Sequence, residues 1–211
     1  MLFVLSAPSG TGKTTVVDRL FRNRPDIRKI VTATTRPKRE GEVQGVDYIF
    51  LTPEEFEIRI REGYFLEYAK VYGSYYGTPK EQVIRNEEEG VDSLLVIDVQ
   101  GAKRLKESYK DCLLLFLMPP SFEELRRRLI NRGYGKENLE ERLKKAREEI
   151  ACARYFDYIV VNDFIDKAVE ALQTIISAQK YRKEKFLKKP SIKDEKVLES
   201  FHKDSCEVFE K

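Results

Sequence analysis

Short apolar runs alternate along the chain with longer amphipathic stretches, and this alternation is the first guide to the fold. The runs LLVI and LLLFLM, at residues 94–97 and 113–118, are continuous. Continuous runs of this length are typical of strands that are buried on both faces of a parallel sheet, with helices between them. The pattern predicts strands near Leu2–Ser6, Lys29–Thr32, Ser93–Asp98, Cys112–Met118 and Tyr158–Val161.

Three helix starts follow from local capping signals. Thr52-Pro53-Glu54-Glu55 offers a hydroxyl cap, a proline at the first helical position and a glutamate that can complete a capping box. Thr78-Pro79 predicts the start of a second helix, and Ser121-Phe122-Glu123-Glu124 predicts that of a third. The alternation of strands and helices favours a three-layer α/β core around a parallel sheet.

Two segments interrupt this alternation. Between residues 33 and 90, short aromatic segments surround one helix, which favours a small mixed-β subdomain inserted into the core. Between two arginine-rich helices, the glycines of residues 133–138 suit a lid at about residues 126–145. We therefore expect one domain at 1–182, with its core at 1–32 and 91–182, the inserted subdomain at 33–90, and a charged tail at 183–211.

The first predicted strand leads into a glycine-rich turn, because residues 6–15 read SAPSGTGKTT and an amphipathic stretch follows. Strand, glycine-rich turn and helix form the context of a phosphate-binding P-loop, although Ala7 replaces the first glycine of the pattern. Lys13 is expected to reach the β- and γ-phosphates of a nucleoside triphosphate, and the Thr14 hydroxyl to ligate Mg²⁺. The alternative is a chance turn with a lysine in solvent.

The predicted strand at residues 93–98 ends in an acid, Asp98. An aspartate at this position in P-loop enzymes lies beside the phosphate loop and orients Mg²⁺, directly or through water. Asp98 can also cap the helix that we expect from Val99, and the two roles are compatible.

A basic loop follows the second predicted strand. It contains Arg36, Lys38 and Arg39 around a proline. The forked donors of arginine match phosphate oxygens in pairs. On composition alone, a solvated basic loop is the simpler interpretation, but the phosphate loop upstream favours a site for a second phosphate.

A single carboxylate, Glu67, interrupts the aromatic segment FLEYA of the inserted subdomain. A carboxylate can accept two N–H donors from guanine, at N1 and N2, whereas adenine offers no such pair. From the spacing alone, an exposed strand residue is an equally good interpretation. Tyr48 and Tyr76 can either hydrogen-bond a phosphate or fill the core.

Arginines gather around the predicted lid. Arg128 and Arg132 are four residues apart and share a helix face, and Arg142 follows the insertion. From a lid, these three side chains can neutralise charge on a transferred phosphoryl group. For Arg126 and Arg127 we expect a solvated basic face.

Composition narrows the class of protein. The formal net charge of +3 over 211 residues predicts no general nucleic-acid footprint. Three widely spaced cysteines fit the reduced thiols of a cytoplasmic protein. His202 is the only histidine and lies in the polar tail, so we expect neither a histidine base nor a histidine metal site. We also expect no signal peptide and no membrane segment.

Taken together, these motifs resemble the guanylate kinase family from Met1 to about Gln179. The segments that carry the resemblance are SAPSGTGKTT, TATTRPKREGEVQGVDYIF, FLEYAKVYGSYYGT, IDVQGAK, RLINRG and VVND. The resemblance implies a P-loop NTPase core with an inserted nucleoside-monophosphate-binding subdomain and a lid. It also implies phosphoryl transfer from MgATP to GMP, with dGMP and the oligomeric state left open. The alternatives are a related P-loop kinase for a ribose bisphosphate and a non-catalytic protein-binding module.

The resemblance further implies a role for each matching residue. The ATP phosphates would lie on Ser9, Gly10, Thr11, Gly12, Lys13, Thr14 and Thr15, with Asn162 in the adenine loop. The GMP phosphate would be held by Arg36, Arg39, Tyr48 and Tyr76, and guanine read by Glu67 and Thr78, with Thr32 and Asp98 nearby. Thr14 and Asp98 would serve Mg²⁺, while Arg39, Arg128, Arg132 and Arg142 would act with Lys13 in catalysis. The chain departs from the family pattern at Val96, usually an acid, at Thr78, usually serine, and in a lid one residue shorter.

Overall fold

The computed structural model describes residues 1–71, 73–131 and 136–182. The chain divides into two units, residues 1–172 and 173–211, and the first unit includes every position of the candidate site. Helix α7 (Ile165–Ala178) crosses the boundary, and the short 3₁₀ helix η2 (Gln179–Tyr181) lies in the second unit. Among the described residues, no helix combines the length and apolar character needed to cross a membrane.

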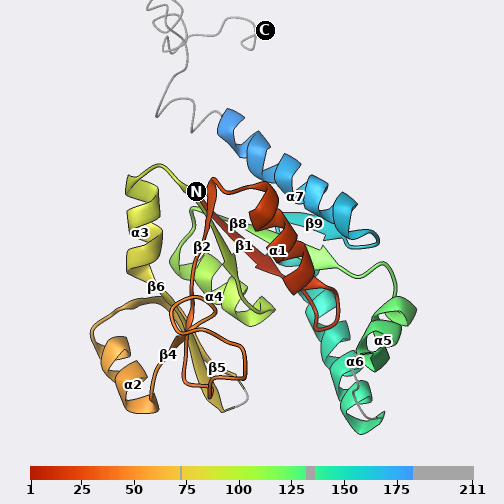
Figure 1. The fold of residues 1–211 in the computed structure, drawn as a ribbon, viewed down its shortest axis with the longest axis horizontal. Helices are drawn as coiled ribbons and strands as arrows, with labels where there is room; N and C mark the ends of the chain where they lie inside the picture. Colours follow the sequence, from red (N-terminus) through yellow and green to blue (C-terminus); the bar gives the residue numbers. More distant parts are fainter. Residues whose placement is uncertain (72, 132–135, 183–211) are drawn as a thin grey trace, which may run out of the picture. The chain divides into compact units, whose positions relative to one another are not determined.

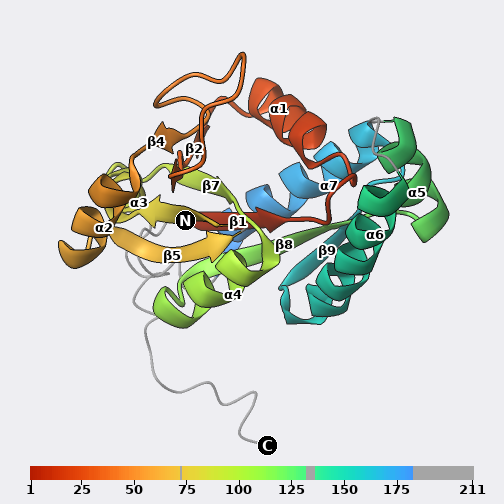
Figure 2. The same ribbon diagram turned by 90° about the horizontal axis from the view of Figure 1, so that it is seen from below.

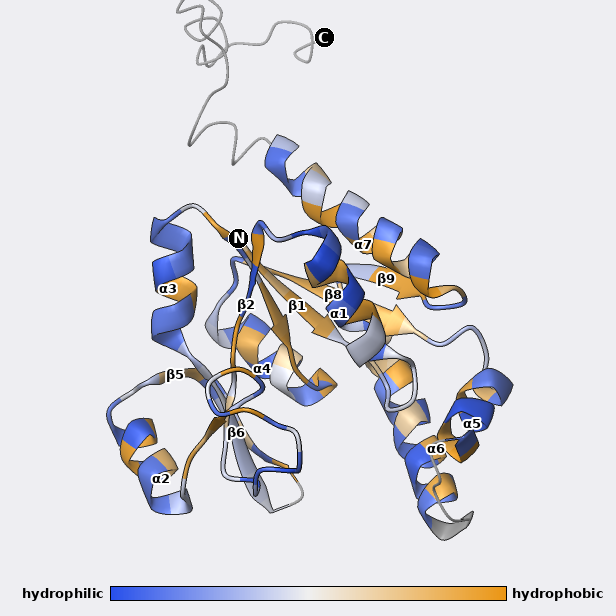
Figure 3. Cartoon of the chain, viewed as in Figure 1, coloured by the Kyte–Doolittle hydropathy of each residue, from blue (hydrophilic) through white to orange (hydrophobic). Residues whose placement is uncertain are grey.

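The main sheet has five parallel strands in the order β2-β7-β1-β8-β9. Helices α1 and α4 lie on its opposite faces (Figures 1 and 2), and the strands form the apolar interior (Figure 3). Leu2 and Val4 pack with Leu105 of α4, while Phe3 and Leu5 alternate with them and are also fully buried. This confirms the three-layer α/β core. The elements are β1 (Leu2–Ser6), α1 (Lys13–Asn23), β2 (Ile27–Lys29), β7 (Asp92–Val96), α4 (Val99–Ser108), β8 (Cys112–Met118) and β9 (Tyr158–Val161).

Three of the five predicted strands, β1, β8 and β9, have the predicted bounds. The second strand was predicted at residues 29–32, but it lies at Ile27–Lys29. The backbone leaves the sheet after Ile30. The amide of Ile30 still donates to the Leu94 carbonyl at 3.0 Å. At Val31, however, both backbone groups bond the side-chain amide of Gln82, each at 2.9 Å. The side-chain amide of Gln82 thus takes the place of the backbone hydrogen bonds that would extend the strand to Val31. The strand predicted at residues 93–98 lies instead at Asp92–Val96, because Asp98 already caps α4.

A second, mixed sheet has the order β4-β3-β6-β5, with β3 parallel to β4 and the other pairs antiparallel. Phe56 stacks between Phe65 and Tyr75, with ring centroids 4.4 and 5.1 Å away. A Cβ at Gly77 would come within 2.8 Å of the Phe65 ring, so the glycine lets the backbone lie against the aromatic core. The structure thus contains the predicted mixed-β region, while the boundaries 33–90 stay a prediction. Its elements are β3 (Ala33–Thr34), β4 (Ile49–Phe50), α2 (Pro53–Arg61), β5 (Phe65–Val71) and β6 (Ser74–Pro79).

Two of the three predicted helix starts are confirmed. Thr52 and Glu55 form a capping box at α2, and the Ser121 hydroxyl accepts the Glu124 amide at 3.0 Å at the start of α5. The helix predicted from Thr78-Pro79 is present as α3, but it begins at Lys80 with Pro79 as its N-cap. Thr78 does not cap it, because Thr78 belongs to β6 and its hydroxyl donates to Glu67. The predicted tail and residues 132–135 lie outside the described residues. The remaining elements are α3 (Lys80–Glu88), α5 (Phe122–Asn131), α6 (Lys136–Ala151) and the 3₁₀ helix η1 (Cys152–Tyr155).

Candidate functional site

The turn between β1 and α1 has the backbone shape of an anion cradle. Gly10 and Gly12 adopt positive φ angles of 88° and 95°, which a side chain would strain. The Thr11 amide donates back to the Pro8 carbonyl at 3.2 Å, and α1 begins at Lys13. The helix N-terminus and the curled backbone therefore face the same space, as a phosphate requires.

Side chains from distant elements hold this loop. The Asn162 amide donates to the Thr11 carbonyl at 2.7 Å, and Arg128 donates to the same oxygen at 3.0 Å. A Cβ at Gly12 would lie 2.8 Å from the Asn162 amide nitrogen, and one at Gly10 would lie 2.9 Å from Leu129. Both glycines are thus required by close approach as well as by backbone angle. Among the described contacts, Asn162 and Arg128 engage the loop backbone itself.

Lys13 is half-buried and lies within electrostatic reach of two carboxylates. Burial lowers the pKa of its ammonium group, and the charges of Glu149 and Asp98 oppose this shift. Glu149 comes from α6 and was not predicted, since nothing in its local sequence distinguishes it from other helix-surface glutamates. Burial also raises the pKa of the Glu149 carboxyl group. Thr14 and Thr15 are exposed on the first turn of α1, where they remain accessible to a ligand.

Asp98 caps helix α4, which is one of the two compatible roles that the sequence allows it, the other being a role at Mg²⁺. One of its carboxylate oxygens accepts the Gly101 amide at 2.7 Å at the start of α4. Asp98 also lines a pocket together with Lys13. Mg²⁺ in phosphoryl-transfer sites takes one or two protein oxygens and completes its shell with phosphates and water. The exposed Thr14 hydroxyl and the Asp98 carboxylate fit that limited requirement.

Four residues predicted to bind the acceptor phosphate lie together. The Arg36 guanidinium is 5.3 Å from the Tyr48 ring centroid, and the rings of Tyr48 and Tyr76 meet edge to face at 6.2 Å. The hydrogen bond to Glu42 raises the pKa of Arg36, with smaller contributions from the Glu42 charge and from Tyr76. Arg39 lies in the same loop and is exposed, so its side chain is accessible.

Glu42 organises this basic loop, and sequence reasoning gave it no role. Its carboxylate accepts both terminal nitrogens of Arg36, at 3.0 and 2.7 Å, and the Arg39 amide at 2.8 Å. Hydrogen bonds from these groups lower the pKa of Glu42. The sequence signal for Glu42 was its place in the same loop as Arg36, six residues later. Side chains of opposite charge at that separation in a loop can form an ion pair.

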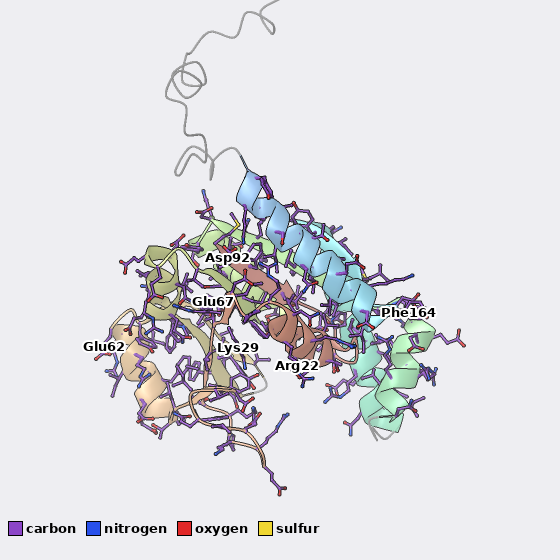
Figure 4. All side chains as sticks on the ribbon, turned by 45° about the horizontal axis from the view of Figure 1, so that its top comes forward. Arg22, Lys29, Glu62, Glu67, Asp92 and Phe164 are labelled. Atoms are coloured by element: carbon purple, nitrogen blue, oxygen red, sulfur yellow. The ribbon has the colours of Figure 1, made fainter. Side chains whose placement is uncertain are left out.

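Glu67 is buried, with 5% of its side chain exposed, which excludes the exposed-strand interpretation. The Thr78 hydroxyl donates to its Oε1 at 2.8 Å, so the two residues predicted to read the base lie together. Burial raises the pKa of Glu67 to about 7, against the opposing effects of Thr78 and of Arg104. Figure 4 shows Glu67 in the middle of the view, whereas Glu62 lies at the outer edge of the molecule. A buried carboxylate with free acceptor positions needs a ligand with donors.

The arginines of the predicted lid differ in their surroundings. Arg142 of α6 donates to the Ser9 hydroxyl at 3.0 Å, beside the phosphate loop. Arg128 bonds Glu124 and two backbone carbonyls, those of Thr11 and Asn162. The structure confirms the solvated face at the exposed residues Arg126 and Arg127, each paired with a surface glutamate. Arg132 lies outside the described residues.

One pocket brings the two halves of the candidate site together. Lys13 contributes from the phosphate loop, Glu67 from the base pocket, and Tyr48 from the acceptor-phosphate cluster. The loop and the acceptor residues are therefore open to the same space. The other residues that line this pocket include Thr32, Tyr76, Asp98 and Arg104.

Comparisons with known proteins agree on one family. The guanylate kinase family model matches residues 1–179. The guanylate kinase of Clostridium tetani is 51% identical over 183 residues, which cover 86% of this chain and 88% of the relative. That of Caldanaerobacter subterraneus is 46% identical over 183 residues, 86% of this chain and 89% of the relative. A crystal structure of guanylate kinase from Anaplasma phagocytophilum has a TM-score of 0.73 and 36% identity, covering 87% of each chain.

Proposed function

This chain belongs to the guanylate kinase family, and we propose from that premise that it transfers the γ-phosphoryl group of ATP to GMP, giving ADP and GDP. The observation that carries the proposal is the shared pocket. Lys13 of the phosphate loop and the buried Glu67 line the same space. An anion cradle and a carboxylate that needs paired N–H donors fit a phosphate donor and a guanine acceptor respectively.

In the donor half, the loop from Ser9 to Thr15 would hold the ATP phosphates through backbone N–H groups, and Lys13 would contact the transferred phosphoryl group. Arg128 and Asn162 would act through the loop, because both bond the Thr11 carbonyl. Arg142 would approach the phosphates from α6, next to Ser9. For Arg132 the same role remains a proposal from the family resemblance. An adenine contact of Asn162 likewise stays a proposal.

In the acceptor half, Arg36, Arg39, Tyr48 and Tyr76 would bind the GMP phosphate. Glu42 holds Arg36 in place, so the guanidinium is ordered before the substrate arrives. Glu67 would accept the N1 and N2 donors of guanine, and its two oxygens supply the paired acceptors that adenine cannot use. Thr78 orients Glu67, while Thr32 and Asp98 complete the wall of the pocket.

Catalysis would rest on positioning and charge. The attacking group is a phosphate oxygen of GMP, which is already anionic at neutral pH, so no general base is required. Holding two phosphates in line makes the transfer effectively intramolecular, and the Lys13 and arginine charges offset the charge that develops on the transferred group. Thr14 and Asp98 would hold Mg²⁺, which would supply positive charge to offset that of the phosphates.

Location and partition of the chain are further parts of the proposal. We place the enzyme in the cytoplasm, in keeping with its widely spaced cysteines. We assign the acceptor subdomain to residues 33–90 and the lid to about residues 126–145, which carry the acceptor residues and the lid arginines.

The test is an ADP-release assay with MgATP and a panel of GMP, dGMP, AMP, CMP, UMP and ribose bisphosphate. We expect turnover with GMP, and the dGMP rate measures whether the ribose 2′-hydroxyl matters. Turnover with ribose bisphosphate alone would leave the phosphate loop assigned but overturn the acceptor. Binding of GMP without turnover of any acceptor would indicate a non-catalytic module.

A further inference from the structure

Arg104 of α4 lies beside the buried Glu67 and lines the same pocket. Its Nε is 3.9 Å from Glu67 Oε2, while Thr78 holds the other oxygen, Oε1, at 2.8 Å. The two ends of one carboxylate therefore face two different donors. A hydroxyl bonds one end, and a guanidinium stands about 1 Å beyond hydrogen-bond distance from the other.

Arg104 has donors to spare. Its Nε and Nη2 are buried and have no hydrogen-bond partner among the residues that the structure describes. Buried donors without partners are unfavourable, so a small movement that satisfies them lowers the free energy. In sites without ligand, hydrogen bonds are often long and tighten when the substrate binds. The separation of 3.9 Å between Arg104 Nε and Glu67 Oε2 is a long contact of this kind.

The helix that carries Arg104 is fixed against the strand that carries Glu67. The Ser108 hydroxyl of α4 can donate to the Leu66 carbonyl of β5, which lies 3.1 Å away, or to one of two carbonyls of its own helix. Gly101, one turn before Arg104, faces the same carboxylate, since an added Cβ would lie in ordinary van der Waals contact with Glu67 Oε2, at 3.6 Å. Closure therefore requires only a side-chain adjustment, without relative movement of the two elements.

We propose that Arg104 is a specificity-determining positioning residue, which closes onto Glu67 Oε2 when the purine binds and holds the carboxylate in the plane of two base N–H groups. The inference rests on the proposed function. With Thr78 at Oε1 and Arg104 at Oε2, the carboxylate is restrained at both ends. The positive charge of Arg104 also opposes the effect of burial on the pKa of Glu67.

The prediction separates two purine acceptors. GMP offers N1–H and a 2-amino group, whereas IMP offers N1–H alone. If the Glu67 carboxylate loses its orientation, the affinity for GMP should fall more than that for IMP, because GMP uses both carboxylate oxygens. Arg104→Gln is therefore expected to raise KM for GMP about tenfold and KM for IMP about twofold, with kcat and KM for ATP unchanged.

Two variants serve as controls. Arg104→Lys keeps the charge and is expected to recover KM for GMP to within about threefold of the original protein. Lys103→Gln removes the neighbouring exposed cation of α4 and is expected to change neither KM. Thermal unfolding of each variant separates a folding defect from a binding defect.

The outcomes distinguish the inference from the function on which it rests. If the unaltered protein turns over GMP and Arg104→Gln leaves KM for GMP unchanged, the role of Arg104 is overturned. An equal increase in KM for GMP and IMP, or a matching increase for ATP, would reduce Arg104 to a structural role and also overturn it. No turnover of GMP by the unaltered protein would overturn the proposed function itself.

Discussion

The phosphate loop is shaped by its own backbone, whereas the acceptor pocket is assembled from side chains of separate elements. In the loop, two glycines with positive φ and the start of α1 create the cradle within a few residues. In the pocket, Glu67 comes from β5, Thr78 from β6 and Arg104 from α4. The loop can therefore be recognised in a short window of sequence, but the pocket exists only once the elements pack.

The two regions also use charge differently. The loop places Lys13 within electrostatic reach of two carboxylates that oppose the effect of its burial. The pocket buries a carboxylate with one cation at 3.9 Å, which leaves the carboxylate partly unsatisfied until a ligand arrives. Lys13 would thus act on any triphosphate, while Glu67 would select among bases. Changes in the loop should abolish activity, and changes in the pocket should alter the choice of acceptor.

The largest effect is expected in the loop. Lys13→Ala removes the cation that would face the transferred phosphoryl group, so kcat/KM should fall about a thousandfold for every acceptor. The assay is ADP release with saturating MgATP, and thermal unfolding should show an intact fold. Lys144→Ala, an exposed lysine of α6, is the matched control. Near-normal activity of Lys13→Ala would remove the assigned role.

A smaller effect is expected at the acceptor phosphate. Arg39→Ala should lower kcat/KM for GMP about a hundredfold, because up to two charge-assisted hydrogen bonds to phosphate are lost. Lys38→Ala removes the adjacent exposed cation and should change kcat/KM by less than about twofold. Equal losses in the two variants would indicate that general charge, and not the position of Arg39, attracts GMP.

The base-reading role of Glu67 is tested by Glu67→Gln, which replaces one acceptor oxygen with a donor. We expect kcat/KM for GMP to fall about thirtyfold while KM for ATP is unchanged. Glu62→Gln, at the outer edge in Figure 4, is the control and should be silent. If both substrates were affected alike, the contrast between a general loop and a selective pocket would fail.

The weakest perturbation is a change of pH. Burial raises the pKa of Glu67 to about 7 from its ordinary value of 4.5, so protons compete with guanine near neutrality. The ionised form is the one that accepts both N–H groups. Below pH 7, kcat/KM for GMP should therefore fall by up to about tenfold per pH unit, toward the level of Glu67→Gln, and above pH 7 the profile should level off.

The phosphate of GMP also titrates, at about pH 6, and needs a separate reference. The Glu67→Gln variant provides it, since that variant keeps the substrate ionisation and lacks the carboxyl group. The difference between the two pH profiles of kcat/KM measures the effect of ionising Glu67. Profiles of the same shape would show that the carboxylate is not the ionising group that GMP binding requires.

Much of the fold was readable because the signals are local. Continuous apolar runs predicted β1, β8 and β9 at their observed bounds, and the hydroxyl caps predicted α2 and α5. Errors arose where a side chain from elsewhere took over a backbone or capping role. Gln82 ended the second strand early, and Glu67 took the hydroxyl of Thr78 that was expected to start a helix.

The sequence by itself determined the phosphate loop, because glycines at fixed spacing between an apolar strand and a helix dictate the backbone angles. It also singled out Glu67 as the one carboxylate in an aromatic segment, and therefore as a candidate for base recognition. Only the tertiary structure decided that Glu67 is buried, that Glu42 holds Arg36, and that Glu149 and Arg104 face Lys13 and Glu67. Burial and ion pairing depend on which residues meet across elements, and local sequence does not encode those distances.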